Sequence, residues 1–503
     1  MTERAGRAPR GAGRTDGVRA MLSGHSILGI AFAAILYLVC LTGTLSVFLR
    51  DFQRWEQPDA PVVTTVGDAA VTRAVTAFGR RVGAHSFYVL LPTDDFPRLM
   101  LSSGGDADDQ SWFADASGRL VARQHAPWID FVQELHTRLH LPATIGRFLV
   151  GLAGVALVSS LISGVLAHPR IIRDAFHLRL GGARRLEQAD WHNRLGVWPL
   201  PFHLLVSLTG ALLGLSTIIV GVLALLLFRG DSERVYALFT PPPPAADARA
   251  TPMPDIARLL EEARRRSDGA IPRQMTVSHW GRGDAQITVS LGRPRLIAQQ
   301  DALVFAATGA IVSEEHPAGR PIGKQILGSL GQLHFGWFGG LATRIVYSLL
   351  GVALCVVTVS GIEIWLARRR DKGRGASVWE RVWTMIVWGQ PLILATLLAA
   401  SLAGGLAAFD PLALWLAGTA TSLALGAAIR TPRQWLDDRL KRATGLIVLI
   451  AGLWRLVSVL GRSVDAAAAI GATVMILAAA GLLLRMATTR RSSRTIARAG
   501  ADM

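Results

Sequence analysis

Cysteine and charged residues are both scarce in this 503-residue chain. The two cysteines, Cys40 and Cys355, lie inside apolar runs, so no disulfide framework holds an extracytoplasmic domain together. Asp, Glu, Lys and Arg make up only 18% of the residues, whereas soluble domains carry about 25%. With a hydrophobic share of 51%, this composition excludes a soluble enzyme, a disordered chain and a disulfide-rich scaffold.

Several catalytic signatures are also missing. The sequence contains no His-Glu-x2-His and no Gly-x-Ser-x-Gly motif, so nothing supports a protease. It contains no Gly-rich dinucleotide turn either. Any oxidation of NAD(P)H would therefore require a separate partner.

Long apolar stretches dominate what is present. A spanning helix needs about 20 mostly apolar residues, and eight stretches qualify. We therefore expect an all-α polytopic membrane protein, with the first stretch kept as an uncleaved helix because it is longer than the apolar region of a signal peptide. The expected spans are 25–49, 145–167, 197–228, 343–366 and four more within 383–486, namely 383–408, 411–429, 443–461 and 466–485.

Two long hydrophilic segments, 50–144 and 229–342, separate the first four spans and are expected to form small domains on one side of the membrane. The whole net charge of +17 falls on the other side, so it reports topology and not nucleic-acid binding. Basic loops face the cytoplasm, which predicts a multi-pass protein of the bacterial inner membrane with both termini cytoplasmic. The basic segments are the N-terminus 1–24, the loops 168–196 and 367–382, the turn 430–442 and the tail 487–503, counted together with Arg485 at the end of the last span.

The first and third spans share a motif. His25 lies 17 residues before Thr42, and His192 lies 17 residues before Thr209. Each threonine belongs to a Leu-Thr-Gly sequence, and in both copies a glycine lies four residues after the histidine. The matching positions indicate that the two spans are copies of one unit.

The second and fourth spans repeat in the same way. His136 precedes Ser163-Gly164 by 27 residues, and His334 precedes Ser360-Gly361 by 26. Because both copies of the helix–domain–helix unit cross the membrane in the same direction, the repeat is a parallel duplication. The first four spans therefore form a duplicated four-helix core, to which four C-terminal helices are added.

The repeated histidines fall at two membrane levels. His25 and His192 begin spans at the cytoplasmic face, whereas His136 and His334 precede spans at the outer face. Helical bundles build cofactor sites from facing side chains, and two neutral imidazoles suit the axial positions of a haem iron. Zinc is the rival metal. It prefers four N, S or O donors, however, and the outer pair has few Cys or acidic residues nearby.

Three further histidines are secondary candidates. His140 lies one turn from His136 and is an alternative outer ligand, and His168 lies at the cytoplasmic end of the second span. His203 lies at membrane depth, where an ionisable side chain indicates function by default. It is an alternative inner ligand, a partner of a haem propionate or a relay.

These motifs resemble the PepSY-associated transmembrane family over residues 21–370. Members are often called iron-regulated or iron-uptake membrane proteins, and some are siderophore reductases. The resemblance implies two PepSY-like periplasmic domains, each a helix on a small antiparallel sheet. The sequences that carry it are Leu135-His136-x2-Leu139, Gly146-Arg-Phe-Leu-Val-Gly151, Asp190-Trp-His192-Asn-Arg-Leu-Gly-Val-Trp-Pro, Leu333-His334-Phe-Gly336 and Ser360-Gly-Ile-Glu-Ile-Trp365.

The resemblance also implies a function. It implies two b-type haems, with His25 and His192 serving the inner one and His136 and His334 the outer one. Electrons would pass from the cytoplasm, from a separate reductase, reduced flavin or quinol, to a periplasmic ferric chelate such as a siderophore. Two alternatives remain: a membrane transporter, and a non-catalytic regulator or peptidase inhibitor acting through the PepSY modules.

Overall fold

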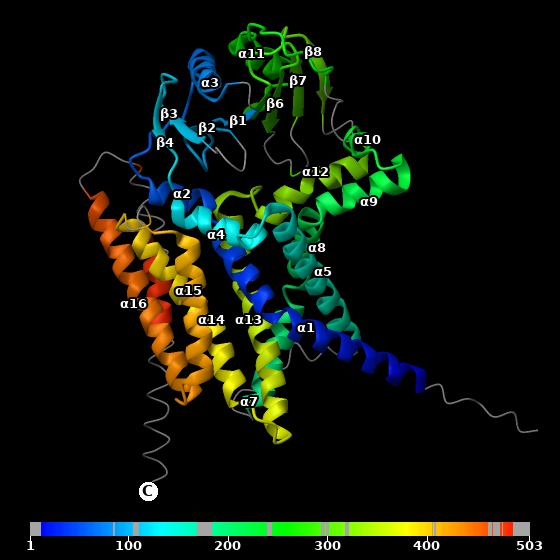
Figure 1. Ribbon diagram of the computed structural model, residues 1–503, viewed down its shortest axis with the longest axis vertical. Coiled ribbons are helices and arrows are strands. Elements are labelled where there is room, and N and C mark those ends of the chain that lie inside the picture. The colour runs from blue at the N-terminus through cyan, green and yellow to red at the C-terminus, as the bar shows by residue number, and fades with distance from the viewer. Residues whose placement is uncertain are drawn as a thin grey trace, which may run out of the picture.

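The computed structural model describes residues 12–83, 86–103, 110–168, 184–238, 244–292, 301–316, 321–404, 409–460 and 476–485, together with positions 297, 406, 465, 473 and 474. The chain divides into a helical membrane part and a β-sheet that lies beyond one end of it (Figure 1). We call the end that carries the sheet the sheet side of the membrane. The opposite end is called the loop side.

Within the described residues, six helices are long and apolar enough to cross a membrane, which agrees with a multi-pass membrane protein. A seventh span results if the bent pair α7 and α8 is counted as one. The eighth expected span, 466–485, lies partly outside the described residues, and a short apolar helix at Ile476–Arg485 is described there. The six helices are α1 (Ala12–Ser46), α5 (Ala143–Ala167), α13 (Gly340–Asp371), α14 (Ser377–Leu402), α15 (Pro411–Ala428) and α16 (Arg433–Val459).

The stretch 197–228, expected as one continuous span, is not a continuous helix, because the chain breaks there twice. Helix α7 (Arg184–Val197) meets α8 (Leu200–Gly214) at an angle of 68°. Pro199 and Pro201 explain this first break, since proline lacks the N–H that would continue the helix of α7. A second break at Leu215 lets α9 (Ser216–Phe228) turn away from α8 (Figure 1).

The strands of the two hydrophilic segments join edge to edge in one antiparallel sheet of eight strands, in the order β4-β3-β2-β1-β5-β6-β7-β8. Strands β1 and β5 pair across the boundary between the two hydrophilic segments, for example Tyr88 with Thr276. The helices α3 (Asp68–Val82) and α11 (Ile256–Arg266) contact each other and cover one face of the sheet. The strands are β1 (Phe87–Leu90), β2 (Leu99–Ser103), β3 (Gln110–Ala114), β4 (Leu120–Arg123), β5 (Ile271–Ser278), β6 (Gln286–Gly292), β7 (Asp301–Ala306) and β8 (Ile311–Glu315).

Short helices lie between the sheet and the membrane spans (Figure 1). Of these, α2 (Leu49–Glu56) and α4 (Pro127–Arg138) belong to the first copy of the repeat. In the second copy, α10 (Ser232–Tyr236) follows α9, and α12 (Ile322–Phe335) is the counterpart of α4. Helices α4 and α12 each carry one of the outer histidines close to their C-terminal ends.

The C-terminal helices contact the first copy of the repeat. The indole of Trp128 on α4 donates a hydrogen bond to the carbonyl of Leu394 on α14 (2.9 Å). Glu56 at the end of α2 accepts a hydrogen bond from Ser401 (2.6 Å), and Arg455 on α16 donates to the Glu56 carbonyl (2.6 Å). These helices therefore hold α2 and α4 in place.

Candidate functional site

The structure brings the four repeated histidines together as two pairs. The rings of His25 and His192 lie on the loop side with centroids 6.0 Å apart and planes at 74°. The rings of His136 and His334 lie on the sheet side with centroids 6.2 Å apart and planes at 22°. Each pair takes one histidine from each copy of the repeat.

All four imidazoles are hydrogen-bonded through Nδ1, three of them to a backbone carbonyl. His25 contacts the carbonyl of Ser160 (2.9 Å), and His192 that of Val357 (3.0 Å). The partner of His136 is the Val39 carbonyl (3.0 Å). A carbonyl oxygen can only accept, so Nδ1 carries the proton and Nε2 keeps its lone pair.

His334 completes this pattern. Its Nδ1 lies 3.0 Å from the hydroxyl oxygen of Thr209, and its ring is also hydrogen-bonded to the backbone of Val206. The Thr209 hydroxyl donates its own proton to the Leu205 carbonyl (2.6 Å), so its oxygen accepts from His334. Among the described residues, none of the four Nε2 atoms has a hydrogen-bond partner.

Glycines explain how the imidazoles reach a helix backbone. Each ring lies against a glycine that follows its acceptor carbonyl by four residues, and a side chain there would collide with the ring. An added Cβ would lie 2.6 Å from Cε1 of His136 at Gly43 and 2.9 Å from Cε1 of His334 at Gly210. The corresponding distances on the loop side are 3.2 Å at Gly164, against His25, and 3.3 Å at Gly361, against His192.

The glycines against which the histidine rings pack therefore belong to the repeated sequence motifs. The Leu-Thr-Gly sequences contact the histidines of the sheet-side pair, and the Ser-Gly sequences contact those of the loop-side pair. Sequence reasoning found both motifs as marks of the repeat but did not connect them to the histidines. The spacing alone could not show this, because each glycine lies on a different helix from its histidine.

The sheet-side histidines are held in the neutral form. Burial lowers the pKa of His136. Burial, followed by the proximity of His136, lowers the pKa of His334 to about 4. Both helices that carry them, α4 and α12, lie outside the membrane-spanning segments. Two neutral imidazoles can both present a lone pair to a metal ion.

Each pair lines a cavity between the helices. The sheet-side cavity has a volume of about 330 Å³ and the loop-side cavity about 460 Å³, which is the range of cofactor sites. Both linings are mainly apolar, and Leu36 and Leu157 contribute to both cavities. Among the described lining residues, the charged side chains are Arg147 on the sheet side and Arg368 on the loop side.

The secondary candidates do not join the pairs. His140 contacts the carbonyl of Phe131 through Nε2 (2.9 Å) and stacks on the Phe131 ring. His168 lines the loop-side cavity. His203 is fully buried on α8 and lines neither cavity, and its ring packs against Phe202.

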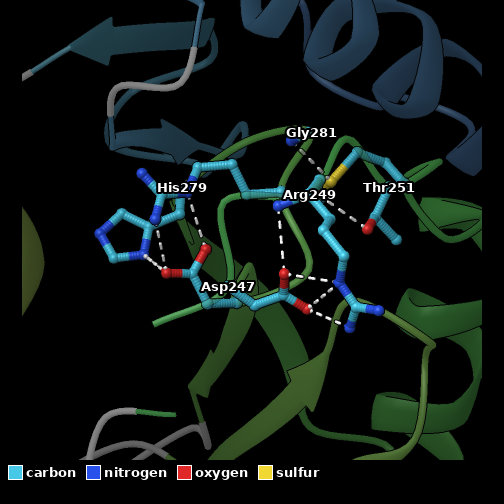
Figure 2. Close-up of polar contacts among 8 residues, drawn as sticks. Asp247, Arg249, Thr251, His279 and Gly281 are labelled. Atoms are coloured by element: carbon cyan, nitrogen blue, oxygen red, sulfur yellow. Dashed lines mark hydrogen bonds and ion pairs between the residues drawn. The ribbon is translucent and has the colours of Figure 1, made fainter. Parts of the chain in front are cut away.

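Figure 2 shows a second polar cluster, at the turn between β5 and β6 of the sheet. Asp247 binds Arg249 through both carboxylate oxygens, and His279 lies 3.3 Å from Asp284. Backbone hydrogen bonds from Thr251 to Gly281 and from Gly283 to Arg249 fasten this segment to the β5–β6 turn. The same turn places Trp280 against Gly79 of α3.

A third donor for either histidine pair is missing from the described part of the chain. Nowhere among those residues do three or more His, Cys, Asp or Glu side chains gather as a metal-binding group. The two sites are thus two-imidazole sites in apolar cavities, one at each end of the helical core. Such a site can hold a flat metal-containing ring from both faces.

Comparison with known proteins assigns the chain to a family. The model of the PepSY-associated TM region matches residues 22–368. The chain is also 32% identical over 254 residues to Uncharacterized protein PA4219 of Pseudomonas aeruginosa, an alignment covering 48% of this chain and 64% of that protein. The chain thus spans a little under two thirds of that relative's length. Since the family match covers well over half of the sequence and includes all four paired histidines, this chain belongs to the family of proteins with a PepSY-associated transmembrane region.

Proposed function

We propose that the protein is a haem-containing electron conduit of the bacterial inner membrane. In this proposal it reduces a periplasmic ferric chelate of the siderophore type with electrons from the cytoplasmic side, and so serves iron acquisition. It would act as a transmembrane ferric-siderophore or metal reductase. The observation that carries the proposal is the pair of facing imidazoles at each end of the core. In each imidazole Nδ1 is hydrogen-bonded, and Nε2 has no hydrogen-bond partner among the described residues.

The donor set supports haem over zinc. Zinc in proteins is bound by three or four protein donors, whereas each site here offers two imidazoles among the described residues. A haem iron takes four ligands from its own ring and needs only two axial ligands from the protein. The apolar linings of the cavities suit a macrocycle.

The spacing of the rings supports the same reading. A first-row metal ion binds an imidazole nitrogen at about 2.0–2.1 Å, and the ring centre lies about 1.1 Å farther, so two axial imidazoles have centroids about 6.3 Å apart. The measured separations are 6.0 and 6.2 Å. The separation of each pair of rings is therefore compatible with one metal ion held between them.

The chain's own residues would prepare each site. The hydrogen bond from Nδ1 to a backbone carbonyl fixes the tautomer and the ring orientation, and it raises the basicity of Nε2. The apolar linings exclude water and thereby set the local dielectric. When bound, each haem supplies a one-electron iron couple, and the protein contributes its position and surroundings.

The charge distribution supports the direction of transfer. The loop side carries the basic segments, which by the positive-inside rule is the cytoplasmic side. The sheet would then lie in the periplasm, where it could contact the ferric chelate. Reduction to Fe(II) weakens a chelate made of hard oxygen donors, so iron would leave it. The cytoplasmic donor would be a separate reductase, reduced flavin or quinol.

A reduced-minus-oxidised absorption spectrum of the purified protein, with haem quantified as the pyridine haemochrome, tests the proposal. We expect sharp b-type bands and about two haems per chain. Absence of haem in protein made with an adequate haem supply would refute the proposal. A transporter or a PepSY regulator would then be the better account.

Single substitutions test the assignment of the ligands. His25→Ala and His192→Ala should each remove the loop-side haem, while His136→Ala and His334→Ala should each remove the sheet-side haem. His140→Ala is the matched control, because His140 lies close in sequence to His136 but bonds to Phe131. It should retain both haems.

A further inference from the structure

Among the described residues, each histidine cavity is lined by one charged side chain, which lies toward the nearer membrane surface. Arg147 is the fifth residue of α5 and lies near the sheet side. Arg368 lies in the last turns of α13, on the loop side. The other described residues of both linings are apolar, small, neutral polar or histidine. The two cavities thus share one plan, although the two arginines do not occupy equivalent positions of the repeat.

These guanidinium groups are available to a ligand. Both arginines are exposed. Among the described residues, neither side chain takes part in an ion pair or a hydrogen bond, whereas Arg344, at the repeat position equivalent to Arg147, binds Asp51 and Asp95. A guanidinium at the rim of an apolar cavity suits a carboxylate, because its planar N–H groups can bind both oxygens.

We propose that Arg147 and Arg368 bind the carboxylates of the two tetrapyrroles and so fix how each ring enters its cavity. This inference rests on the proposed function. The acidic edge of each ring would face its own membrane surface, and the apolar edges would face each other. Leu36 and Leu157, which line both cavities, would then lie between those apolar edges.

The orientation has a chemical consequence. A positive charge beside the ring and its carboxylates favours the reduced iron, which carries one positive charge less than the oxidised form. Removing that charge should lower the midpoint potential of the neighbouring haem and leave the other haem unchanged. It should also accelerate haem loss about tenfold, the factor expected for one charge-assisted hydrogen bond at an exposed site.

The test is a spectroelectrochemical titration of the purified full chain, together with the rate of haem transfer to an apoprotein scavenger. Arg147→Gln should lower the potential of one haem and release it about tenfold faster, and Arg368→Gln should do so for the other. Arg147→Lys should restore most of the potential, because the charge returns, but less of the retention, because lysine does not bind bidentately. Exposed arginines outside the cavities serve as matched controls: Arg234→Gln for the sheet side and Arg374→Gln for the loop side.

The outcomes separate the two proposals. If the wild-type protein contains no haem, both the proposed function and this inference fail. If it contains two haems but Arg147→Gln and Arg368→Gln behave as their controls do, the function stands and the carboxylate assignment is wrong. If the midpoint potentials of both haems shift in either variant, the charge acts at long range and not through a bound carboxylate. That result also overturns the assignment.

Discussion

The contact between Gly43 and His136 gives a quantitative prediction. A methyl group at Gly43 would lie 2.6 Å from Cε1 and 3.0 Å from Nδ1 of His136. Carbon atoms pack comfortably at about 3.5–4.0 Å, so the imidazole would have to move by about 1 Å. Metal–ligand distances tolerate changes of only about 0.2 Å. Gly43→Ala should therefore remove the sheet-side haem and reduce the content from about two haems per chain to about one.

The loop-side glycine gives the matched comparison. In Gly164→Ala the added methyl group would lie 3.2 Å from His25, so the ring must shift by only a few tenths of an ångström. We expect this variant to keep both haems, with a changed spectrum for one. Gly221→Ala on α9 is the control, because nothing lies within 4 Å of the added methyl group. All three changes raise helix propensity by about 1 kcal/mol, so differences among them isolate the contact with the ring.

The assay is the haem content of each variant in the same detergent, combined with a redox titration that resolves the two haems. The reasoning would be refuted if Gly43→Ala bound two haems with wild-type potentials. That result would mean that His136 does not depend on the glycine contact for its position. Loss of both haems in Gly221→Ala would instead show that the helices tolerate no substitution, and the comparison would carry no weight.

Three further predictions concern the parts that hold the site. Burial raises the pKa of Glu56 to about 7, so Glu56 contributes fully to the free energy of unfolding below its ordinary pKa near 4.5. That contribution falls by about 3 kcal/mol as the pH rises to about 7. Glu56→Gln should remove this fall, as measured by thermal unfolding across that pH range. Glu363 on α13 binds Arg433 on α16, and a double-substitution cycle should give a coupling free energy of about 1–3 kcal/mol, whereas a value near zero would mean that the pair does not join the C-terminal helices to the core. Trp280→Ala should destabilise the sheet by about 3 kcal/mol in denaturant unfolding without changing haem content, and a loss of haem would contradict the separation of the two regions.

The sequence was sufficient for the pairing of the histidines because the membrane limits where each residue can lie. A histidine at the start of a span is confined to one surface, and the parallel repeat brings its counterpart to the same surface. His25 with His192 and His136 with His334 follow from that reasoning, and the structure places them so. The sequence could not identify Arg147 and Arg368 as site residues, because many arginines lie near span ends. Only the cavity linings distinguish these two.

Two features of the fold could not be read from the sequence. The apolar run 216–228 has the composition of a spanning helix, but hydropathy does not report direction, and α9 turns away from α8. The joining of the two expected domains depends on the pairing of β1 with β5, in which for example Phe87 pairs with Val277, far away in the sequence. Edge strands of separate small sheets offer unpaired backbone groups, and pairing them with each other satisfies those groups.

The duplication explains why both sites exist together. Each histidine packs against a glycine of its own copy, as His136 does against Gly43, but pairs with the histidine of the other copy. In the first copy a single helix, α1, carries both His25 and Gly43, which lie 18 residues or about 27 Å apart along the axis, close to the hydrocarbon thickness of a membrane. One helix therefore contributes to a site at each surface. A chain with a single copy would present one imidazole at each level, so neither two-imidazole site can form without both copies.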